Sequence, residues 1–411
     1  MKRRVVITGM GTINPLGNDT NTTWQAAKAG KNGIDTITRF DTKDLGVSIA
    51  GEVKNVDMLE RFGKKQMRRM DRFTALAMIA TEEAIHDSGI DLDHIDKSKV
   101  GVYYASGIGG IETIAIEQQK GHERGFHRIS PFFIPTAIIN ISAGNIAIKY
   151  GFTGMSTAPV TACASANNAI GDAFRAVRDG YLEMVVAGAS EAAITELGLG
   201  GFKVMQALSK TNDRNAASTP FDLNRSGFVM GEGAATFILE PLDSAKARGA
   251  TIYGEIVGYG STCDATHITS PDPQGEGARR CMLMSLDDAK VSLDTVDYIN
   301  AHGTSTPLND RVETLAIKRL FGERARDISI SSTKSMTGHL LGASGAIEAL
   351  LTVMAIKDGF IPPTINYRTP DPECDLDYTP NEGKAKPIRT ALSNSFGFGG
   401  HNATLAFRKV E

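Results

Sequence analysis

The sequence is poor in cysteine and contains no long apolar run, and each scarcity excludes a class of protein. Four cysteines occur in 411 residues without a Cys-x-x-Cys pair: Cys163, Cys263, Cys281 and Cys374. This spacing predicts neither a disulfide framework nor a zinc site, and it favours a reducing compartment. No stretch of about 18 apolar residues occurs, so we expect no transmembrane helix.

A strong excess of charge is also absent. The formal net charge of −3 argues against nucleic-acid binding through bulk electrostatics. The apolar run near the N-terminus covers only residues 5–7, too short for a secretory signal peptide, so we expect a cytoplasmic protein that does not bind membranes. With 41% hydrophobic and 22% charged residues, the composition is typical of a globular protein.

The chain is long enough for two domains or for one duplicated unit. A predicted helix ends at Arg178-Asp179-Gly180, and another ends at Lys357-Asp358-Gly359. Counting back the same distance from each glycine places Cys163 opposite Gly342. Strands and helices alternate around both segments, so we predict a duplicated α/β unit with halves at residues 1–250 and 251–411.

Cys163 lies between a short extended run and a strongly periodic helix. The apolar positions of that helix follow the spacing of one buried face: Ala166, Ala169, Ile170, Ala173, Phe174 and Val177. A thiol at a helix N-terminus is expected to have a lowered pKa. The alternative is an inert thiol buried as a small apolar group.

The first strand is predicted at residues 4–8, followed by a glycine-containing loop. A long helix is predicted over 64–88 with Gly89 as its C-terminal cap. Its first turns carry a basic face, formed by Lys65, Arg68, Arg69 and Arg72. Such a face is either simply solvated or a docking surface for an acidic macromolecule.

Candidate acid–base partners follow strands in the second half of the chain. His302 and His339 each stand beside glycine after a predicted strand, and two histidines with one cysteine suit acyl transfer. Glu348 lies among apolar helix positions, where a carboxylate needs a partner. Lys334 is the expected partner, and the pair is expected to hold His339 in position.

The segment 393–402 opens from a strand end into glycines flanked by Phe396 and Phe398. Glycine permits close approach of the backbone to a ligand. A backbone N–H of this loop, together with that of Cys163, is predicted to form an oxyanion hole.

Four motifs together resemble the β-ketoacyl-[acyl carrier protein] synthases of thiolase-like fold, in particular the elongating enzymes of bacterial fatty acid synthesis. They are Thr161-Ala162-Cys163-Ala164-Ser165, His302-Gly303-Thr304-Ser305-Thr306, Thr333-Lys334-Ser335-Met336-Thr337-Gly338-His339 and Asn394-Ser395-Phe396-Gly397-Phe398-Gly399-Gly400. The resemblance covers nearly the whole chain. It implies an α/β, five-layered αβαβα fold of two duplicated halves and a homodimer. It also implies that no metal or cofactor is needed, because acyl carrier protein delivers acyl and malonyl groups on its phosphopantetheine arm.

The resemblance also implies roles for individual residues. Cys163 takes the acyl group, His302 and His339 stabilise the enolate that forms from malonyl-carrier protein, and Lys334 and Glu348 support the site. Phe398 contributes to the oxyanion hole with Cys163 and gates the acyl pocket. The implied pocket residues are Ile108, Phe202, Phe398 and, from the partner subunit, Phe133. Thr304 and Thr306 are expected to contact phosphopantetheine, and Lys64, Lys65, Arg68 and Arg69 to dock the carrier protein.

Two positions depart from the family pattern and leave chain-length preference open. Asn168 stands where many elongating enzymes carry histidine, and His401 where many carry threonine. The alternatives are a polyketide ketosynthase, a thioester-cleaving cysteine hydrolase and a noncatalytic acyl-binding protein. A biosynthetic thiolase would need a second reactive cysteine in a Cys-x-Gly setting, which Cys374 does not supply.

Overall fold

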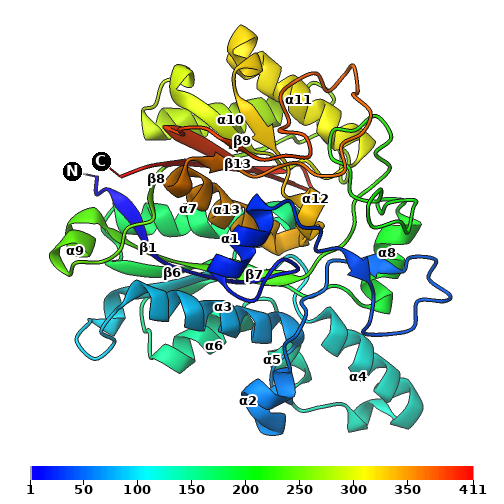
Figure 1. Ribbon diagram of the computed structural model, residues 1–411. Coiled ribbons are helices and arrows are strands. Elements are labelled where there is room, and N and C mark those ends of the chain that lie inside the picture. Colours follow the sequence, from blue (N-terminus) through cyan, green and yellow to red (C-terminus); the bar gives the residue numbers. More distant parts are fainter. Residues whose placement is uncertain (1, 411) are drawn as a thin grey trace.

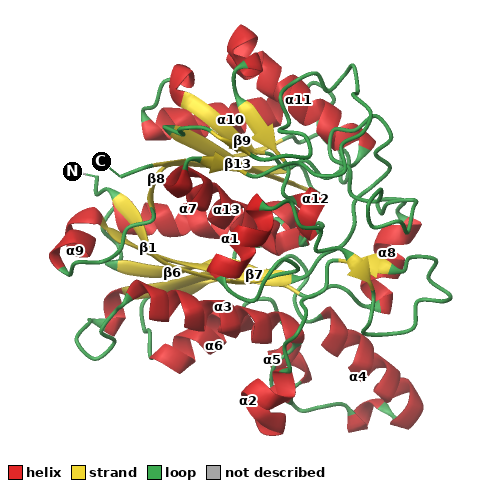
Figure 2. Ribbon diagram, viewed as in Figure 1, coloured by secondary structure: helices red, strands yellow, loops and turns green. Residues whose placement is uncertain are grey.

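The computed structural model describes residues 2–410 and builds one ten-stranded sheet in two halves (Figures 1 and 2). The strand order is β10-β9-β13-β14-β8-β1-β7-β6-β4-β5, and antiparallel pairing of β1 with β8 joins the halves. The strands are β1 (Val5–Ile13), β4 (Val100–Ala105), β5 (Ser156–Thr157), β6 (Met184–Glu191), β7 (Gly233–Pro241), β8 (Gly254–Cys263), β9 (Val296–Asn300), β10 (Ser329–Ser331), β13 (Thr390–Gly397) and β14 (His401–Arg408). Two short ribbons pair β2 (Asp35–Thr36) with β3 (Ile49–Ala50) and β11 (Phe360–Ile361) with β12 (Lys384–Ala385).

Helices fill the space between the two halves of the sheet and cover both outer faces (Figure 1). The central layer is α7 (Ser165–Arg178) and α13 (Ser344–Asp358); α3 (Arg72–Ser88) and α6 (Ile141–Tyr150) cover one outer face, and α10 (Glu276–Ala289) and α11 (Pro307–Phe321) the other. The predicted αβαβα fold is therefore confirmed. The remaining helices are α1 (Thr20–Lys28), α2 (Met58–Met67), α4 (Ile111–Arg124), α5 (Phe133–Ala137), α8 (Glu196–Val204), α9 (Leu242–Ala247) and α12 (Lys334–Thr337).

The two central helices begin in the same way. A single 3-10 turn precedes each of them, Ala162–Ala164 before α7 and Leu341–Ala343 before α13. Ala162 and Leu341 both adopt positive φ, at 51° and 48°, a conformation that is uncommon for residues with a side chain. Shared local geometry at the same offset supports the duplication, whereas the boundary at residues 250 and 251 stays a prediction.

The predicted helix over residues 64–88 is wrong, because the chain breaks into α2 and α3. Asp71 is extended and caps α3, accepting a hydrogen bond from the N–H of Phe73. Arg72 then turns inward and forms a two-bond ion pair with the fully buried Glu232. The cap and this buried pair remove Arg72 from the expected basic face, while Gly89 ends α3 in the left-handed region as predicted.

The first strand is longer than predicted, because it continues through Gly9 and Gly11 to Ile13. A Cβ at Gly9 would lie 2.3 Å from the carbonyl oxygen of Ala84, and one at Gly11 would lie 2.1 Å from that of Ala80. Both glycines therefore serve the close packing of α3 on β1 rather than a loop. No helix within residues 2–410 is long and apolar enough to cross a membrane.

Candidate active site

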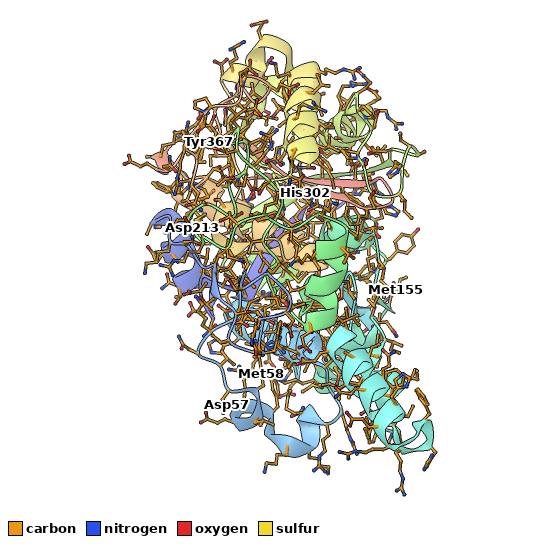
Figure 3. All side chains as sticks on the ribbon, turned by 90° about the vertical axis from the view of Figure 1, so that its right-hand side faces the viewer. Asp57, Met58, Met155, Asp213, His302 and Tyr367 are labelled. Atoms are coloured by element: carbon orange, nitrogen blue, oxygen red, sulfur yellow. The ribbon has the colours of Figure 1, made fainter. Side chains whose placement is uncertain are left out.

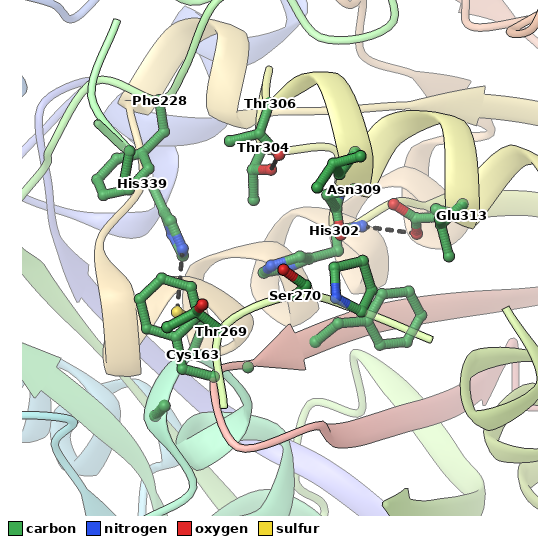
Figure 4. A pocket seen from close by; sticks show the side chains of 18 of the residues that line it. Cys163, Phe228, Thr269, Ser270, His302, Thr304, Thr306, Asn309, Glu313 and His339 are labelled. Atoms are coloured by element: carbon green, nitrogen blue, oxygen red, sulfur yellow. Dashed lines mark hydrogen bonds between the residues drawn. The ribbon is translucent and has the colours of Figure 1, made fainter. Parts of the chain in front are cut away.

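Cys163 opens into a cavity of about 520 Å³ whose walls come from both halves of the fold. Figure 4 shows Cys163, His302 and His339 converging on it, with Thr304 and Thr306 along another side. The structure thus brings together the cysteine and both histidines that the sequence singled out. A cavity bordered by apolar rings with a few convergent polar groups is typical of a ligand site.

The thiol of Cys163 does not have the lowered pKa that the sequence predicted. Cys163 does precede α7, within the turn Ala162–Ala164. Burial nevertheless raises the pKa of the thiol to about 12, and the Lys334 ammonium and the backbone N–H of Cys163 offset only part of that effect. The prediction is wrong because desolvation of the thiolate outweighs the helix terminus. Cys163 therefore needs a base to accept its proton.

His339 lies where such a base is required. Its Nε2 is 3.2 Å from Cys163 Sγ, and its Nδ1 is 2.8 Å from Ser344 Oγ. The backbone of His339 is fixed by hydrogen bonds with Val229 and Gly231. Burial holds the pKa of this imidazole well below its ordinary value, so the ring is neutral at neutral pH and is able to accept a proton.

Lys334 and Glu348 form the predicted buried pair, with exposed side-chain fractions of 1% and 3%. Lys334 Nζ lies 3.4 Å from Nδ1 of His302, so the prediction that the pair holds His339 is wrong: it contacts His302. An ammonium group only donates hydrogen bonds. His302 Nδ1 must therefore accept, which places the ring proton on Nε2. Burial, and next the Lys334 charge, hold the pKa of His302 well below its ordinary value.

Glu313 is a site residue that the sequence analysis missed. Its carboxylate accepts a hydrogen bond from the backbone N–H of His302 at 2.9 Å (Figure 4). It also accepts from the N–H of Gly303 at 2.8 Å and from the side chain of Asn394. Burial raises its pKa to about 7. The sequence did contain a sign of this role. Glu313 shares the apolar face of α11 with Ala316 and Ile317, and a carboxylate on a buried face needs hydrogen-bond partners.

Aromatic rings form much of the cavity wall near Cys163. The Phe202 ring lies 5.4 Å from that of Phe228 and 6.4 Å from that of Phe398, and Phe202, Phe398 and Ile108 all line the cavity. Phe228, which the sequence analysis did not assign to the site, also stacks edge-on against His339. Phe133 begins α5 and is not among the lining residues of this chain, so its contribution from a partner stays a prediction.

The threonines and the glycine loop both border the cavity. The hydroxyls of Thr304 and Thr306 lie 2.9 Å apart. A Cβ added at Gly397 would stand 3.0 Å from the backbone nitrogen of Cys163, so the loop that carries Phe398 packs directly against Cys163. The oxyanion role of the Phe398 N–H stays a prediction.

Neither Asn168 nor His401, the two positions that depart from the family pattern, is among the lining residues of the cavity. Asn168 accepts a hydrogen bond from Thr161 Oγ1 at 2.7 Å and donates to Tyr259 and Ser261. It therefore acts in a buried polar network beside the cavity. Within residues 2–410, no cluster of His, Cys, Asp and Glu side chains is arranged to hold a metal ion.

The basic residues Lys64, Lys65, Arg68 and Arg69 are exposed and lie outside the cavity lining. They sit on α2 and the segment that follows it. Figure 3 shows Asp57 and Met58, at the start of α2, in the lower part of the molecule and well below His302. The Arg69 guanidinium lies 4.7 Å from the centre of the Phe132 ring, which joins this basic surface to the exposed aromatic segment before α5.

Comparison with known proteins places this geometry in a family. The model described as "Beta-ketoacyl synthase, N-terminal domain" matches residues 2–245, and "Beta-ketoacyl synthase, C-terminal domain" matches residues 253–368. The chain is 51% identical over 409 residues to "3-oxoacyl-[acyl-carrier-protein] synthase 2" of Staphylococcus aureus strain COL, covering 100% of the chain and 99% of that relative. A Synechocystis relative of the same name is also 51% identical, over 411 residues, with the same coverage.

Solved structures are similar over their whole length. A β-ketoacyl synthase from Burkholderia phymatum matches this chain with a TM-score of 0.92 and 36% sequence identity. The ishigamide ketosynthase/chain length factor matches it with a TM-score of 0.94 and 33% sequence identity. A type II polyketide ketosynthase in complex with its acyl-carrier protein and bound to the hexaketide has 0.92 at 36%. Each comparison covers 100% of both chains. Since both family models match in order and relatives at 51% identity align end to end, the chain belongs to the β-ketoacyl synthase family and has its thiolase-like fold.

Proposed function

We propose that this protein catalyses the decarboxylative condensation of a Cys163-bound acyl chain with malonyl-acyl carrier protein, giving a β-ketoacyl product two carbons longer in fatty acid elongation. The single observation that carries the proposal is the convergence of Cys163, His339 and His302 on one cavity, with His339 Nε2 3.2 Å from Sγ. The full-length relatives named 3-oxoacyl-[acyl-carrier-protein] synthase 2 support the same reaction.

The first step transfers the acyl group to the enzyme. His339 Nε2 accepts the Cys163 proton, and the sulfur attacks the acyl thioester carbon. The backbone N–H groups of Cys163 and Phe398 donate to the oxyanion of the tetrahedral intermediate. The carrier's phosphopantetheine sulfur then leaves and takes up the proton, and the acyl chain remains on Cys163, extending along Ile108, Phe202 and Phe398.

The second step makes the carbon nucleophile. Malonyl-carrier protein binds with its thioester oxygen toward the two histidines, and the Lys334 contact keeps a proton on His302 Nε2 for donation to that oxygen. For this step His339 changes tautomer by proton exchange with solvent: Nδ1 loses its proton and accepts from the Ser344 hydroxyl, and Nε2 carries the ring proton, so that His339 is the second donor. As the carboxylate leaves as CO₂, the negative charge that develops on the oxygen is stabilised by these donors. The enolate carbon attacks the acyl-cysteine carbonyl and releases the Cys163 sulfur.

The substrate path is proposed to begin at the two threonines. Thr304 and Thr306 contact the phosphopantetheine arm, and the exposed Lys64, Lys65, Arg68 and Arg69 attract an acidic carrier protein. The proposed enzyme is a homodimer, in which Phe133 of each protomer completes the partner's acyl pocket. Its proposed location is the cytoplasm. The steps use only groups of the chain and its carrier-bound substrates, and require neither metal nor cofactor.

The proposal is tested by incubating the protein with acyl- and malonyl-carrier protein and weighing the products. The expected result is an acyl adduct on Cys163 followed by a β-ketoacyl product two carbons longer, and Cys163→Ala abolishes both. Condensation by the variant at the wild-type rate refutes the mechanism. Release of free acid without a need for the malonyl donor identifies a cysteine hydrolase instead.

A polyketide ketosynthase is the second candidate. One similar solved structure is a ketosynthase with its type II polyketide acyl-carrier protein, and another is the ishigamide ketosynthase/chain length factor. The chemistry at Cys163 would be the same, and the acyl chain would differ. Competition between a saturated acyl-carrier and a poly-β-keto acyl-carrier for acylation of Cys163 separates the two, since a fatty acid elongating enzyme prefers the saturated chain.

A further inference from the structure

Glu191 is a buried carboxylate that the proposed mechanism does not use. It ends β6, and its exposed fraction is 0%. It accepts hydrogen bonds from the backbone N–H groups of Gly107 and Ile108, at 2.8 and 3.2 Å, and from the Ser106 hydroxyl at 2.9 Å. The N–H of Gly342, in the other half of the fold, donates to it at 3.0 Å. Because every partner donates, the arrangement suits an ionised carboxylate.

These donors belong to two loops of the active-site wall. Gly107 and Ile108 follow β4, whereas Gly342 is the second-half counterpart of Cys163, and all three line the cavity. The loops touch without room for a side chain: a Cβ at Gly342 would stand 2.2 Å from the nitrogen of Gly107, and one at Gly107 would stand 2.7 Å from Glu191 Oε2. The carboxylate therefore joins the loop that presents Ile108 to the turn beside Cys163.

We infer that Glu191 is a positioning residue that ties these two wall loops together and thereby sets how far an acyl chain extends past Ile108. The inference rests on the proposed function, because it assigns the acyl chain to this part of the cavity. Loss of the carboxylate leaves the buried N–H groups of Gly107, Ile108 and Gly342 without an acceptor, so the Ile108 loop would shift away from the turn. Burial raises the pKa of Glu191, and its four hydrogen-bond donors offset part of that rise. In its ionised form the carboxylate opposes formation of the Cys163 thiolate.

Two variants separate geometry from charge. Glu191→Gln presents an amide N–H to the backbone N–H groups and removes the charge, whereas Glu191→Asp keeps the charge on a shorter side chain. Acylation of Cys163 is measured with short and long saturated acyl-carriers. Both variants are expected to raise the ratio of long-chain to short-chain acylation about tenfold, the discrimination that small changes in an apolar pocket produce.

Alkylation of Cys163 by iodoacetamide at mildly alkaline pH provides a second readout that needs no acyl substrate. Glu191→Gln is expected to react about tenfold faster, which corresponds to one unit of thiol pKa, and Glu191→Asp at the wild-type rate within a factor of two. Glu240→Gln is the matched control, because Glu240 is equally buried but pairs with Arg248 away from the cavity. It should leave both readouts unchanged.

Unchanged chain-length ratios in both Glu191 variants overturn the inference, as does an equal change in the Glu240 control. Should Glu191→Gln fail to fold, Ser106→Ala removes one donor to Glu191 and the acceptor of the Gly109 N–H. It is expected to shift the chain-length ratio about threefold, within the range for the loss of one or two hydrogen bonds. A wild-type protein that forms no acyl-enzyme refutes the proposed function itself, whereas the alkylation rates still report on Glu191.

Discussion

Replacing Lys334 with methionine should destabilise the protein and disable His302 together. Lys334 and Glu348 are only 1% and 3% exposed at their side chains, and Glu348 Oε2 has no hydrogen-bond partner within residues 2–410. Methionine preserves most of the volume and removes the charge. Glu348 then stands as an unpaired buried carboxylate, and breaking such a pair by removing one partner costs about 3–5 kcal/mol.

A second estimate of the stability lost in Lys334→Met gives the same range. In the variant, Glu348 avoids a buried charge by binding a proton. The ordinary pKa of a glutamate carboxyl lies about 2.7 units below pH 7, and each unit corresponds to about 1.36 kcal/mol, so protonation at pH 7 costs about 3.7 kcal/mol. Burial already raises the pKa of Glu348, and the Lys334 charge opposes that rise. Without Lys334 the pKa rises further, so the variant's stability is greatest below the unfolded-state pKa and falls as pH rises toward the folded-state pKa.

The assay is urea unfolding of wild type and Lys334→Met at about pH 5 and about pH 7. The loss of stability should reach about 3–4 kcal/mol at the higher pH and shrink toward about 1 kcal/mol at the lower pH, because less free energy is then needed to protonate Glu348. A loss below about 1 kcal/mol at pH 7, or one that does not change with pH, refutes the reasoning.

The double variant Lys334→Met/Glu348→Leu separates stability from catalysis. Replacing both members of a buried pair with apolar groups is often neutral or stabilising, so the double variant should recover most of the lost stability. It should not recover condensation, because nothing then donates to His302 Nδ1 and the imidazole is free to place its proton on the wrong nitrogen. Recovery of full activity would show that the Lys334 contact does not set the tautomer.

Three further predictions concern other parts of the site. His302→Ala should lower condensation by about 10²–10³-fold, the usual effect of losing one oxyanion donor, while acylation of Cys163 measured by mass persists; an equal loss of acylation would make His302 a base for the thiol. Thr306→Val should raise KM for malonyl-carrier protein about fivefold at unchanged kcat, consistent with one lost hydrogen bond, and a fall in kcat alone would contradict an arm-binding role. Lys65→Glu should raise KM for acyl-carrier protein at low salt and less at high salt, whereas Lys246→Glu, an exposed lysine on α9, should not.

The sequence by itself determined the family and the alternation of strands and helices, and it predicted which groups react. The motifs around Cys163, His302 and His339 consist of particular residue types at short spacing along the chain, so they are recognised from the sequence alone. The duplication was also readable, because Cys163 and Gly342 occupy the same position relative to their helices, and the matching positive φ values of Ala162 and Leu341 follow from it.

Tertiary structure decided what depends on contacts between distant segments. Periodicity alone joined residues 64–88 into one helix, but the break at Asp71 depends on a cap and on the burial of Arg72 against Glu232, some 160 residues away. The prediction of a glycine-containing loop after residue 8 failed for a related reason. Gly9 and Gly11 lie in β1 and let α3 pack closely against it.

The electrostatics of the site were likewise a tertiary result. Sequence placed Cys163 at a helix terminus and predicted a lowered pKa, whereas burial in the assembled cavity raises it. The Lys334–Glu348 pair was expected from composition, yet only the fold shows that it reaches His302 rather than His339. A helix terminus is a local feature of the chain, but desolvation and the contacts of a buried charge are set by everything packed around it.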